Sequence, residues 1–571
     1  MIKLIFILKI ISKLVILFTF FTNLYSKPLQ KYENAVSISN YLSGILSISN
    51  NEYNLSYNFL KKLNGLEDYH QNFSGAYISS LVKIGKFREA YRYAKNLESK
   101  NIDYFNSNLI IGTYYIKNKN LKKAKIYFEK NEKKENSIIF NKMISQVLYS
   151  WVNEDKDIYL KNENNSNFFG AEFKNIEKIQ RAFFNCYWNS NKTEDSFLEL
   201  ISDKEVNFSR YYFFYIKYLL SKGKNFEAEK QLIKALKDNP RNLMLNNLRI
   251  DFKKKKINEK INYFDCSNIS HAIAEFYYLI SNLLSSQGLY SISNFYLSLA
   301  KFLNTNFISY ETLYAENLLY NERYKEAHTL YEKIKEKGEI YNWHATKKLV
   351  AINFKKEKSD QKKIQALSAS FNLISNPTPY HRYDYADLLR RYKNYKMSIN
   401  QYSLILDSID VSHELYSKTT DGRGIAYERS GQWQNAEKDF LSSLDKEPNQ
   451  PYVINYLAYS WVEKGVKIEE SLKMLRKANQ LKKNDGYIID SLGWALHKLK
   501  RYKEAKKYLQ QAVTLMPSDP IVNDHYGDSL WMNGNKLQAR YYWNYVLKLE
   551  ETEEKLKETI KNKLINGIKQ I

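Results

Sequence analysis

The eight histidines are the side chains best suited to acid–base or metal chemistry, and their spacing argues against both. No two of them have the i, i+4 spacing around a glutamate that builds a zinc protease site on a helix. Asp524 and Asp528 flank His525 and resemble part of a charge relay, but the sequence supplies no nucleophile at a defined distance. We therefore expect these residues to act at a helix surface or cap. The histidines are His70, His271, His328, His344, His381, His413, His497 and His525.

One segment, Asp421-Gly-Arg-Gly424, has the glycines of a phosphate-binding loop. It lacks the lysine and the preceding strand that such a loop requires. Gly424 also falls on a periodic position of the chain described below, so we interpret the segment as helix packing. The sequence thus predicts no catalytic residue, no cofactor and no metal, and we expect no enzyme.

The chain has two cysteines, which excludes a disulfide framework and most cysteine-based zinc sites. Cys186 and Cys266 are 80 residues apart, more than two of the helical units described below. Stacked helices add roughly 8–10 Å per layer, whereas a disulfide needs Cα atoms within about 7 Å. We expect two unpaired, mostly buried thiols; the alternative is a redox pair.

The N-terminal segment, residues 1–26, predicts a secretory signal peptide. Three lysines accompany an unbroken apolar core, Leu14–Phe21, that is shorter than the roughly 18–20 residues needed to span a bilayer. Cleavage is expected after Ser26, with an uncleaved N-terminal membrane anchor as the alternative. Both interpretations export residues 27–571, so we expect a periplasmic or envelope-associated protein.

The formal net charge of +25 raises the question of a polyanionic partner. Residues 417–553 contain 21 Lys and Arg against 18 Asp and Glu, a net charge of +3, and the rest of the excess is spread widely. The densest run, Lys253–Lys256, predicts a solvated linker. A nucleic-acid surface would place basic residues along one helix face with stacking aromatics. We expect no nucleic acid, while anionic envelope polymers remain possible partners.

The period of the small residues predicts the architecture. The chain of 571 residues has only 18 Gly and 8 Pro, which argues against loop-rich β folds. Small residues recur every 34 or 35 positions, and in the C-terminal half a proline follows the second small residue of some units. The first-helix series are Gly424, Ala458, Gly493, Gly527 and Gly44, Ile78, Gly112; the second-helix residues are Ala436, Ala505, Ala539 and Ser56, Ala90, Ala124.

Each unit holds two amphipathic stretches of about 12–14 residues, which predicts an antiparallel helix pair. We expect the small residue of the first helix to face that of the second, so that the helix axes approach to the close end of the 8–10 Å range. Proline ends the second helix. Because so short a pair cannot bury its apolar face alone, the units must stack into an all-α solenoid.

These residues resemble the tetratricopeptide repeat (TPR) family, which implies a right-handed superhelix of antiparallel helix pairs. The resemblance covers about residues 37–553 and is strongest in 417–553. Its C-terminal part is also similar to a group of large exported TPR proteins of alphaproteobacteria. The matching signature is Ile489, Leu492, Gly493, Leu496, Ala505, Leu509, Ala512 and Pro517.

The resemblance also implies a domain organisation. Helix pairs of irregular length are expected wherever the motif is degenerate. The predicted parts are 1–26 as signal peptide or anchor, 27–138 as N-terminal units, 139–273 as degenerate repeats with one clear unit at 209–242, 274–416 as middle units, 417–553 as regular units and 554–571 as a capping tail.

In TPR arrays the first helix of each unit lines the concave face, so its inward positions are candidate ligand residues. In the last three units these positions are aromatic and acidic, and they lack the Lys, Arg and Asn pattern that clamps a C-terminal carboxylate. Packing against the next unit is the alternative role. The predicted groove consists of Tyr452, Asn455, Tyr459, Tyr487, Asp490, Trp494, Asp524, Asp528 and Trp531, with Val462, His497 and Ile521 on the same stripes.

The sequence therefore predicts a non-enzymatic protein–protein interaction scaffold of the cell envelope. An acidic, aromatic groove should prefer apolar partner segments that carry Lys or Arg. Two alternatives stay open. One is an accessory component of polysaccharide or cell-wall export and assembly. The other is an unrecognised enzyme within 139–273, which an α/β insert there would indicate and a continuation of helix pairs would not.

Overall fold

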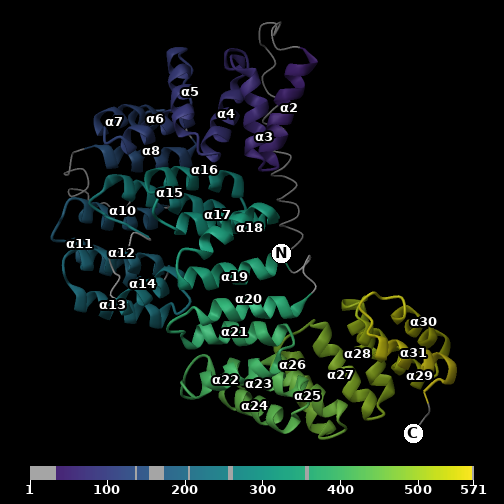
Figure 1. Cartoon of the computed structure of the whole chain (residues 1–571). Helices are drawn as coiled ribbons and strands as arrows, with labels where there is room; N and C mark the ends of the chain where they lie inside the picture. Colours follow the sequence, from purple (N-terminus) through teal and green to yellow (C-terminus); the bar gives the residue numbers. More distant parts are fainter. Residues whose placement is uncertain are drawn as a thin grey trace. The chain divides into compact units, whose positions relative to one another are not determined.

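The computed structural model describes residues 34–134, 138–153, 173–203, 206–254, 262–353 and 359–568 (Figure 1). Within these ranges every regular element is a helix and no strand occurs, which confirms the all-α prediction. The helices form antiparallel pairs that pack in sequence. The predicted signal peptide lies outside the described residues. The chain divides into two compact units, residues 1–356 and 357–571.

The first unit contains two short 3₁₀ helices, Lys61–Leu63 and Leu66–Asp68, and a series of α-helices. These are α2 (Ala35–Ser49), α3 (Tyr53–Leu60), α4 (Gln71–Lys83), α5 (Phe87–Ser99), α6 (Phe105–Lys117), α7 (Leu121–Glu132), α8 (Ile139–Val152), α10 (Lys174–Tyr187), α11 (Thr193–Ser202), α12 (Ser209–Ser221), α13 (Asn225–Asp238), α14 (Leu243–Lys253), α15 (Ile269–Ser286), α16 (Tyr290–Leu303), α17 (Ser309–Tyr320), α18 (Tyr324–Lys335) and α19 (Glu339–Asn353).

The second unit continues the pattern with helices of 11 to 14 residues. They are α20 (Asp360–Asn372), α21 (Pro379–Arg391), α22 (Tyr395–Leu406), α23 (Tyr416–Arg429), α24 (Trp433–Lys446), α25 (Pro451–Glu463), α26 (Ile468–Leu481), α27 (Gly486–Lys498), α28 (Tyr502–Leu515), α29 (Pro520–Met532), α30 (Lys536–Val546) and α31 (Glu554–Asn566).

The periodic glycines are sites of close helix approach. A Cβ atom added to Gly493 would lie 2.6 Å from Leu509 Cγ, and equivalent clashes closer than 3.0 Å occur wherever a glycine occupies this position. The atoms nearest to the first-helix glycine belong to a bulky residue of the second helix, and the expectation that two small residues face each other stays a prediction. The first-helix glycine contacts a bulky side chain of the second helix, located four residues after the small residue of that helix. This side chain fills the space that a Cβ atom on the glycine would occupy. The pairs are Gly44–Leu60, Gly112–Phe128, Gly424–Phe440, Gly493–Leu509 and Gly527–Trp543.

Gly493→Val is expected to destabilise the C-terminal repeats by about 1–3 kcal/mol, because the branched side chain overpacks the contact with Leu509. Hydrogen exchange should show the loss first in residues 451–485 and 520–553, because repeat stability depends on nearest neighbours. Gly75→Ala is the matched control, since a Cβ there meets no atom within 4 Å. Equal loss of protection across the whole chain would contradict this packing account.

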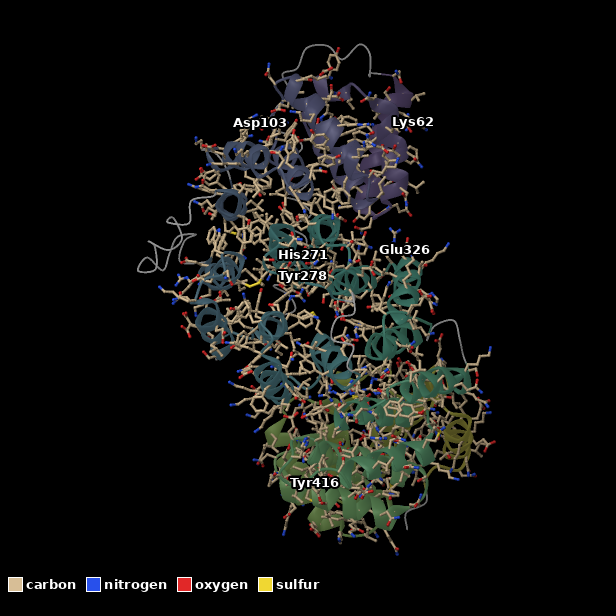
Figure 2. All side chains as sticks on the ribbon, turned by 60° about the vertical axis from the view of Figure 1, so that its left-hand side comes forward. Lys62, Asp103, His271, Tyr278, Glu326 and Tyr416 are labelled. Atoms are coloured by element: carbon tan, nitrogen blue, oxygen red, sulfur yellow. A yellow bond between two sulfur atoms is a disulfide. The ribbon has the colours of Figure 1, made fainter. Side chains whose placement is uncertain are left out.

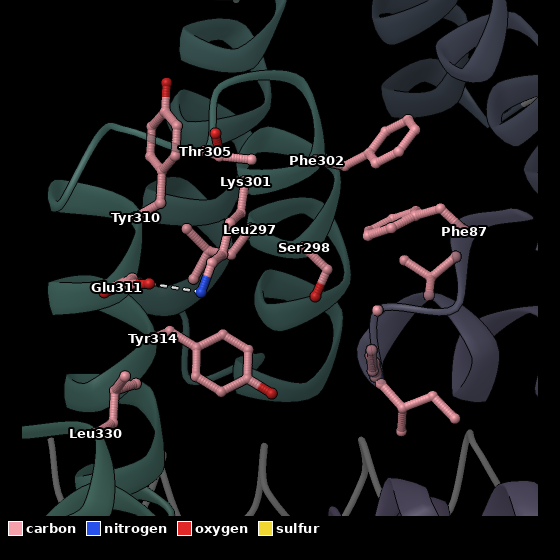
Figure 3. Close-up of a pocket in the computed structure, with 14 residues that line it drawn as sticks. Phe87, Leu297, Ser298, Lys301, Phe302, Thr305, Tyr310, Glu311, Tyr314 and Leu330 are labelled. Carbon is pink, nitrogen blue, oxygen red and sulfur yellow. Dashed lines mark hydrogen bonds and ion pairs between the residues drawn. The ribbon is translucent and has the colours of Figure 1, made fainter. Parts of the chain in front are cut away.

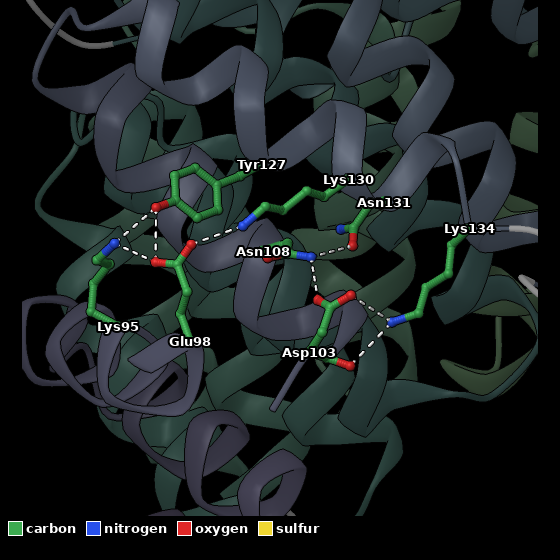
Figure 4. Close-up of polar contacts among 8 residues, drawn as sticks. All are labelled: Lys95, Glu98, Asp103, Asn108, Tyr127, Lys130, Asn131 and Lys134. Carbon is green, nitrogen blue, oxygen red and sulfur yellow. Dashed lines mark hydrogen bonds and ion pairs between the residues drawn. The ribbon is translucent and has the colours of Figure 1, made fainter. Parts of the chain in front are cut away.

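Neighbouring units are also joined by polar contacts between their second helices. Glu98 of α5 accepts hydrogen bonds from Lys130 at 2.8 Å and from the Tyr127 hydroxyl at 3.0 Å, both on α7, and it pairs with Lys95 (Figure 4). Burial raises the pKa of Glu98, but the two lysines and the tyrosine together lower it to about 2. Because the α7 partners are 29 and 32 residues away, the repeat period itself brings these charges together.

The expectation of two unpaired thiols is wrong. Cys186 of α10 and Cys266, just before α15, form a disulfide with their Cα atoms 5.8 Å apart (yellow bond in Figure 2). The expectation assumed that each intervening repeat moves the two cysteines further apart. This assumption fails because the long helix α15 packs against the earlier helices α6, α8 and α10. The segment before α15 therefore returns to a helix that precedes it by two repeats.

A buried ion pair fixes this return of the chain. Arg210 of α12 donates two hydrogen bonds, at 2.6 and 2.8 Å, to the carboxylate of Glu275 on α15. The guanidinium carbon lies 3.7 Å from the centre of the Tyr278 ring, which is labelled in Figure 2. The Glu275 carboxylate is buried and Arg210 is partly buried, so removing Arg210 would leave a buried carboxylate without its counter-charge.

Candidate functional site

The candidate site lies on α25, α27 and α29, the first helices of the last three regular units. Positions 487, 490 and 494 follow the i, i+3, i+7 spacing of one helix face, and so do 521, 524, 528 and 531. We call the surface formed by Tyr459, Asp490, Trp494, Asp524, Asp528 and Trp531 the acidic face.

His525 stands at the centre of the acidic face. Its Nδ1 atom lies 2.9 Å from Asp490 Oδ2, and its ring stacks on Trp494 with ring centres 3.9 Å apart. Burial lowers the pKa of His525, but Asp490, Asp524 and Asp528 together raise it above its ordinary value. The Trp494 indole also donates to Glu463 at 2.5 Å. This network links α25, α27 and α29.

The two remaining carboxylates are held by the C-terminal helix. Lys563 Nζ lies 2.7 Å from Asp524 Oδ1 and 2.8 Å from Asp528 Oδ1. The Trp543 indole donates to Asp528 at 3.0 Å. Burial and the neighbouring Asp524 raise the pKa of Asp528 to about 7, against the opposing effect of Lys563. A single ammonium group therefore serves two closely spaced buried carboxylates.

The apolar side of helix α31 packs against the C-terminal core, and this packing places Lys563 beside the two carboxylates. Ile560 is fully buried, and Leu564 and Ile568 pack against the C-terminal core. The Trp531 indole donates to the Ile568 carbonyl at 3.1 Å. The tail is thus an amphipathic, Lys-rich helix that places apolar side chains on the C-terminal core and one lysine on the acidic face.

The predicted groove residues fall into three classes of exposure. Tyr452, Tyr487 and Ile521, at the start of their helices, are exposed; Asn455, Tyr459, His497 and Trp531 are half-buried; Val462, Asp490, Trp494, Asp524 and Asp528 are buried. The structure gathers the residues of the acidic face around two groups: Tyr459, Asp490 and Trp494 surround His525, whereas Asp524, Asp528 and Trp531 contact the C-terminal tail. Their use by a partner stays a prediction. Sequence reasoning missed Lys563, although Ile560, Lys563 and Leu564 have the spacing of one helix face.

The expectation that Asp524, His525 and Asp528 act at a helix surface or cap is wrong, because all three lie within α29 and are buried. His525 is engaged by Asp490 and Trp494, and in the described chain no hydroxyl or thiol bonds to its ring. The Asp421–Gly424 segment lies inside α23, where Gly424 contacts Phe440. Arg423 forms two hydrogen bonds to Asp439, at 2.7 and 2.8 Å. The packing interpretation of this glycine segment is therefore confirmed.

The described residues contain neither a metal-binding cluster nor a membrane-spanning helix. No group of three or more His, Cys, Asp or Glu residues in the described ranges is arranged to hold a metal ion. Among the helices of those ranges, none combines the length and the apolar character that crossing a membrane would require.

Comparison with known proteins agrees with the helix pairs. A family model described as "Tetratricopeptide repeat" matches residues 488–519, which comprise most of α27, α28 and the turn after them. Residues 488–519 therefore match a tetratricopeptide repeat. A TPR repeat-containing protein of Pseudomonas aeruginosa is 30% identical over 106 residues, which are 19% of this chain and 18% of that protein. The chain therefore matches less than a fifth of the length of this relative.

Solved TPR structures align with about a third of the chain. MamA from Desulfovibrio magneticus is 16% identical, with 31% of this chain and 97% of that chain covered and a TM-score of 0.27. A thermophilic TPR protein of Thermus thermophilus is 13% identical, with 33% of this chain and 100% of that chain covered and a TM-score of 0.29.

The repeat matched by residues 488–519 is of a type that is typical of protein–protein interaction scaffolds. Proteins built from such repeats bind protein or peptide partners and are typically not enzymes. The particular role of any TPR protein depends on the side chains it presents, because the same fold hosts many functions.

Proposed function

We propose that this chain is an exported, non-enzymatic scaffold of the bacterial cell envelope that binds apolar, Lys- or Arg-bearing partner segments at its acidic face. The observation that supports this most is the contact of Lys563 with Asp524 and Asp528. Here the chain's own tail places a lysine next to apolar side chains, which is the combination that the face was predicted to prefer in a partner. Opposite charges steer such a segment to the face and fix its register.

The exposed aromatic and aliphatic side chains beside the acidic face offer anchors for a partner. Tyr487 is 60% exposed and Ile521 is 50% exposed, and both precede the buried carboxylates on their helices. A few such anchors carry most of the energy of a protein interface. A partner segment that enters here would contact these side chains and meet the tail at Lys563.

Tyr487→Ala with Ile521→Ala is expected to weaken partner binding by about 1–3 kcal/mol for each anchor without loss of helicity. Binding is measured by co-purification of envelope proteins after cross-linking in cells. Leu537→Ala with Tyr541→Ala is the matched control, because these side chains are 85% and 67% exposed on the second helix α30. Recovery of the same envelope proteins by both double variants would contradict the proposed surface.

The envelope location is supported by the charge and length pattern of residues 1–26. Deleting this segment is expected to leave the protein in the cytoplasm, since the pattern is that of a secretory signal. Fractionation of cells expressing the chain with and without the segment measures the outcome. Membrane association that survives the deletion would count against the signal peptide.

The alternative of a hidden enzyme within 139–273 finds no support in the described part of that segment. Helices α8 and α10–α14 fill it, and α10–α11 and α12–α13 are antiparallel pairs of the same kind as their neighbours. The continuation of helix pairs favours the scaffold.

A further inference from the structure

A second candidate site lies in the first unit around Lys83, the last residue of α4. Three hollows, with volumes of about 480, 540 and 570 Å³, share this residue in their walls. Each has the size of a pocket for a small molecule. Helices far apart in the sequence form them, because α4 packs against α16.

The ammonium group of Lys83 has neutral neighbours. Its Nζ atom lies 2.7 Å from Ser291 Oγ and 4.3 Å from the centre of the Tyr53 ring. In the described parts of the chain, no carboxylate pairs with it, and burial lowers the pKa of Lys83 to about 7. Lys83 is partly buried, and placing an ammonium where it is shielded from water without a counter-charge is costly.

The other charged groups around the three hollows are largely paired with one another. Lys301 of α16 pairs with Glu311 of α17 at 2.5 Å, and Arg323 pairs with Glu326 at the start of α18. Among the described residues, Lys83 is the basic group that lacks an anion where the hollows meet. The titratable groups that line the hollows with Lys83 are Glu52, Tyr53, Lys301, Tyr310, Glu311, Tyr314, Arg323, Glu326 and Lys333, together with Tyr41 and Tyr296.

The hollow of about 480 Å³ has mainly apolar walls. Phe87 stacks on Phe302 with ring centres 4.2 Å apart on one side, and Tyr314 and Leu330 stand on the opposite side (Figure 3). Figure 3 also shows the Lys301–Glu311 pair, which leaves this lysine engaged. Lys83 lines this hollow too, and its ammonium group contacts Ser291 and Tyr53, which line the two adjoining hollows.

We propose that Lys83 binds the head group of a small amphipathic carboxylate whose aliphatic body fills the hollow lined by Phe87, Phe302, Tyr314 and Leu330. The carboxylate supplies the missing counter-charge, and the apolar walls bury the aliphatic body. Because the walls come from α4, α5 and α16–α18, a bound ligand would tie the N-terminal repeats to the middle repeats. The site is separate from the acidic face and does not depend on the function proposed for it.

The test measures binding of dodecanoate to the full chain by equilibrium dialysis, below the concentration at which micelles form. We expect saturable binding of one molecule per chain, at least tenfold weaker in Lys83→Met. Lys301→Met is the matched control, because this lysine lines the same hollow but already has a partner; it should change the affinity less than threefold. Lys83→Arg retains the charge and should keep most of the binding. Dodecanol, which has the same body without the charge, should bind at least tenfold more weakly than dodecanoate.

The pH dependence of dodecanoate affinity shows whether Lys83 pairs with the bound carboxylate or only supports the structure. Above pH 7 the free protein must take up a proton at Lys83 before it can pair with the carboxylate, so affinity should fall as the pH rises from 6 to 8.5. Proton uptake on binding should be measurable at pH 8 in the wild type and absent in Lys83→Met.

Three results would overturn the proposal: no saturable binding of dodecanoate, equal binding by the wild type and a folded Lys83→Met chain, or equal binding of dodecanol. Binding of an acidic peptide in place of dodecanoate would also overturn it. If circular dichroism shows Lys83→Met to be unfolded, Lys83→Arg decides: loss of binding in that folded variant would contradict the proposal.

Discussion

Lys563→Met is expected to detach α31 from the acidic face. The substitution keeps an unbranched apolar side chain but leaves Asp524 and Asp528 buried without a cation. Removing one partner of a buried ion pair costs about 3–5 kcal/mol. The loss of stability is limited to the free energy with which α31 docks. If the penalty is larger, α31 separates and water hydrates the two carboxylates. Hydrogen exchange should therefore show strongly reduced protection in residues 554–566, with the first unit unchanged.

Two further variants test whether charge is the cause. Lys557→Met is the matched control, since Lys557 pairs only with the exposed Glu554 on the same helix. Asp528→Asn, added to Lys563→Met, should restore part of the protection by removing one buried charge. Unchanged protection of α31 in Lys563→Met would show that its apolar contacts alone hold the helix.

The C-terminal repeats, including α31, are expected to lose stability against unfolding as the pH rises from about 4 to 7. The pKa of Asp528 is raised to about 7, so its carboxyl stays protonated in the folded chain at pH values where the unfolded chain is ionised. A raised pKa stabilises the folded state at low pH, and this stabilisation is lost as the pH passes through 7. The raised pKa of His525 acts in the same direction. Protection of α31 that increases with pH would contradict this assignment.

Replacing both cysteines, Cys186→Ser with Cys266→Ser, is expected to destabilise the first unit by about 2–5 kcal/mol. The effect should lie toward the upper end because the bond closes a loop with a sequence separation of 80 residues. Hydrogen exchange across α10–α15 and the midpoint of urea unfolding measure it. Double replacement avoids leaving a reactive single thiol.

A reductant provides the control for the disulfide. It should destabilise the wild-type first unit by a similar amount and leave the double variant unchanged, because the chain has no other cysteine. Equal urea midpoints for the wild type and the double variant would show that the Arg210–Glu275 pair and the surrounding core hold this region without the bond.

The repeat period predicts the contacts between neighbours in the sequence and little else. Gly493 and Leu509 belong to one helix pair, so the spacing of small and large residues places them within reach of each other. The approach of Cys266 to Cys186 and of Lys83 to Ser291 depends on how the stack turns back on itself. A local pattern that repeats every 34 residues does not predict how distant repeats pack against each other.

The candidate site was predictable to a similar extent. Helical spacing places Asp490, Trp494, Asp524 and Asp528 on inward stripes, and the structure brings them together. The pattern does not specify what covers them. The tail is visibly amphipathic, but the register that brings Lys563 to two carboxylates is set by the packing of Ile560 and by the Trp531 contact with the tail.

Site-specific photo-cross-linking at position 487 of the full chain tests the central claim most directly. A photoreactive residue at position 541, on the exposed side of α30, serves as the reference position. The account predicts envelope protein adducts at 487 that are absent at 541, with cross-linked segments that are apolar and carry Lys or Arg. Absence of adducts at 487, the same adducts at both positions, or cross-linked segments that are acidic would contradict it.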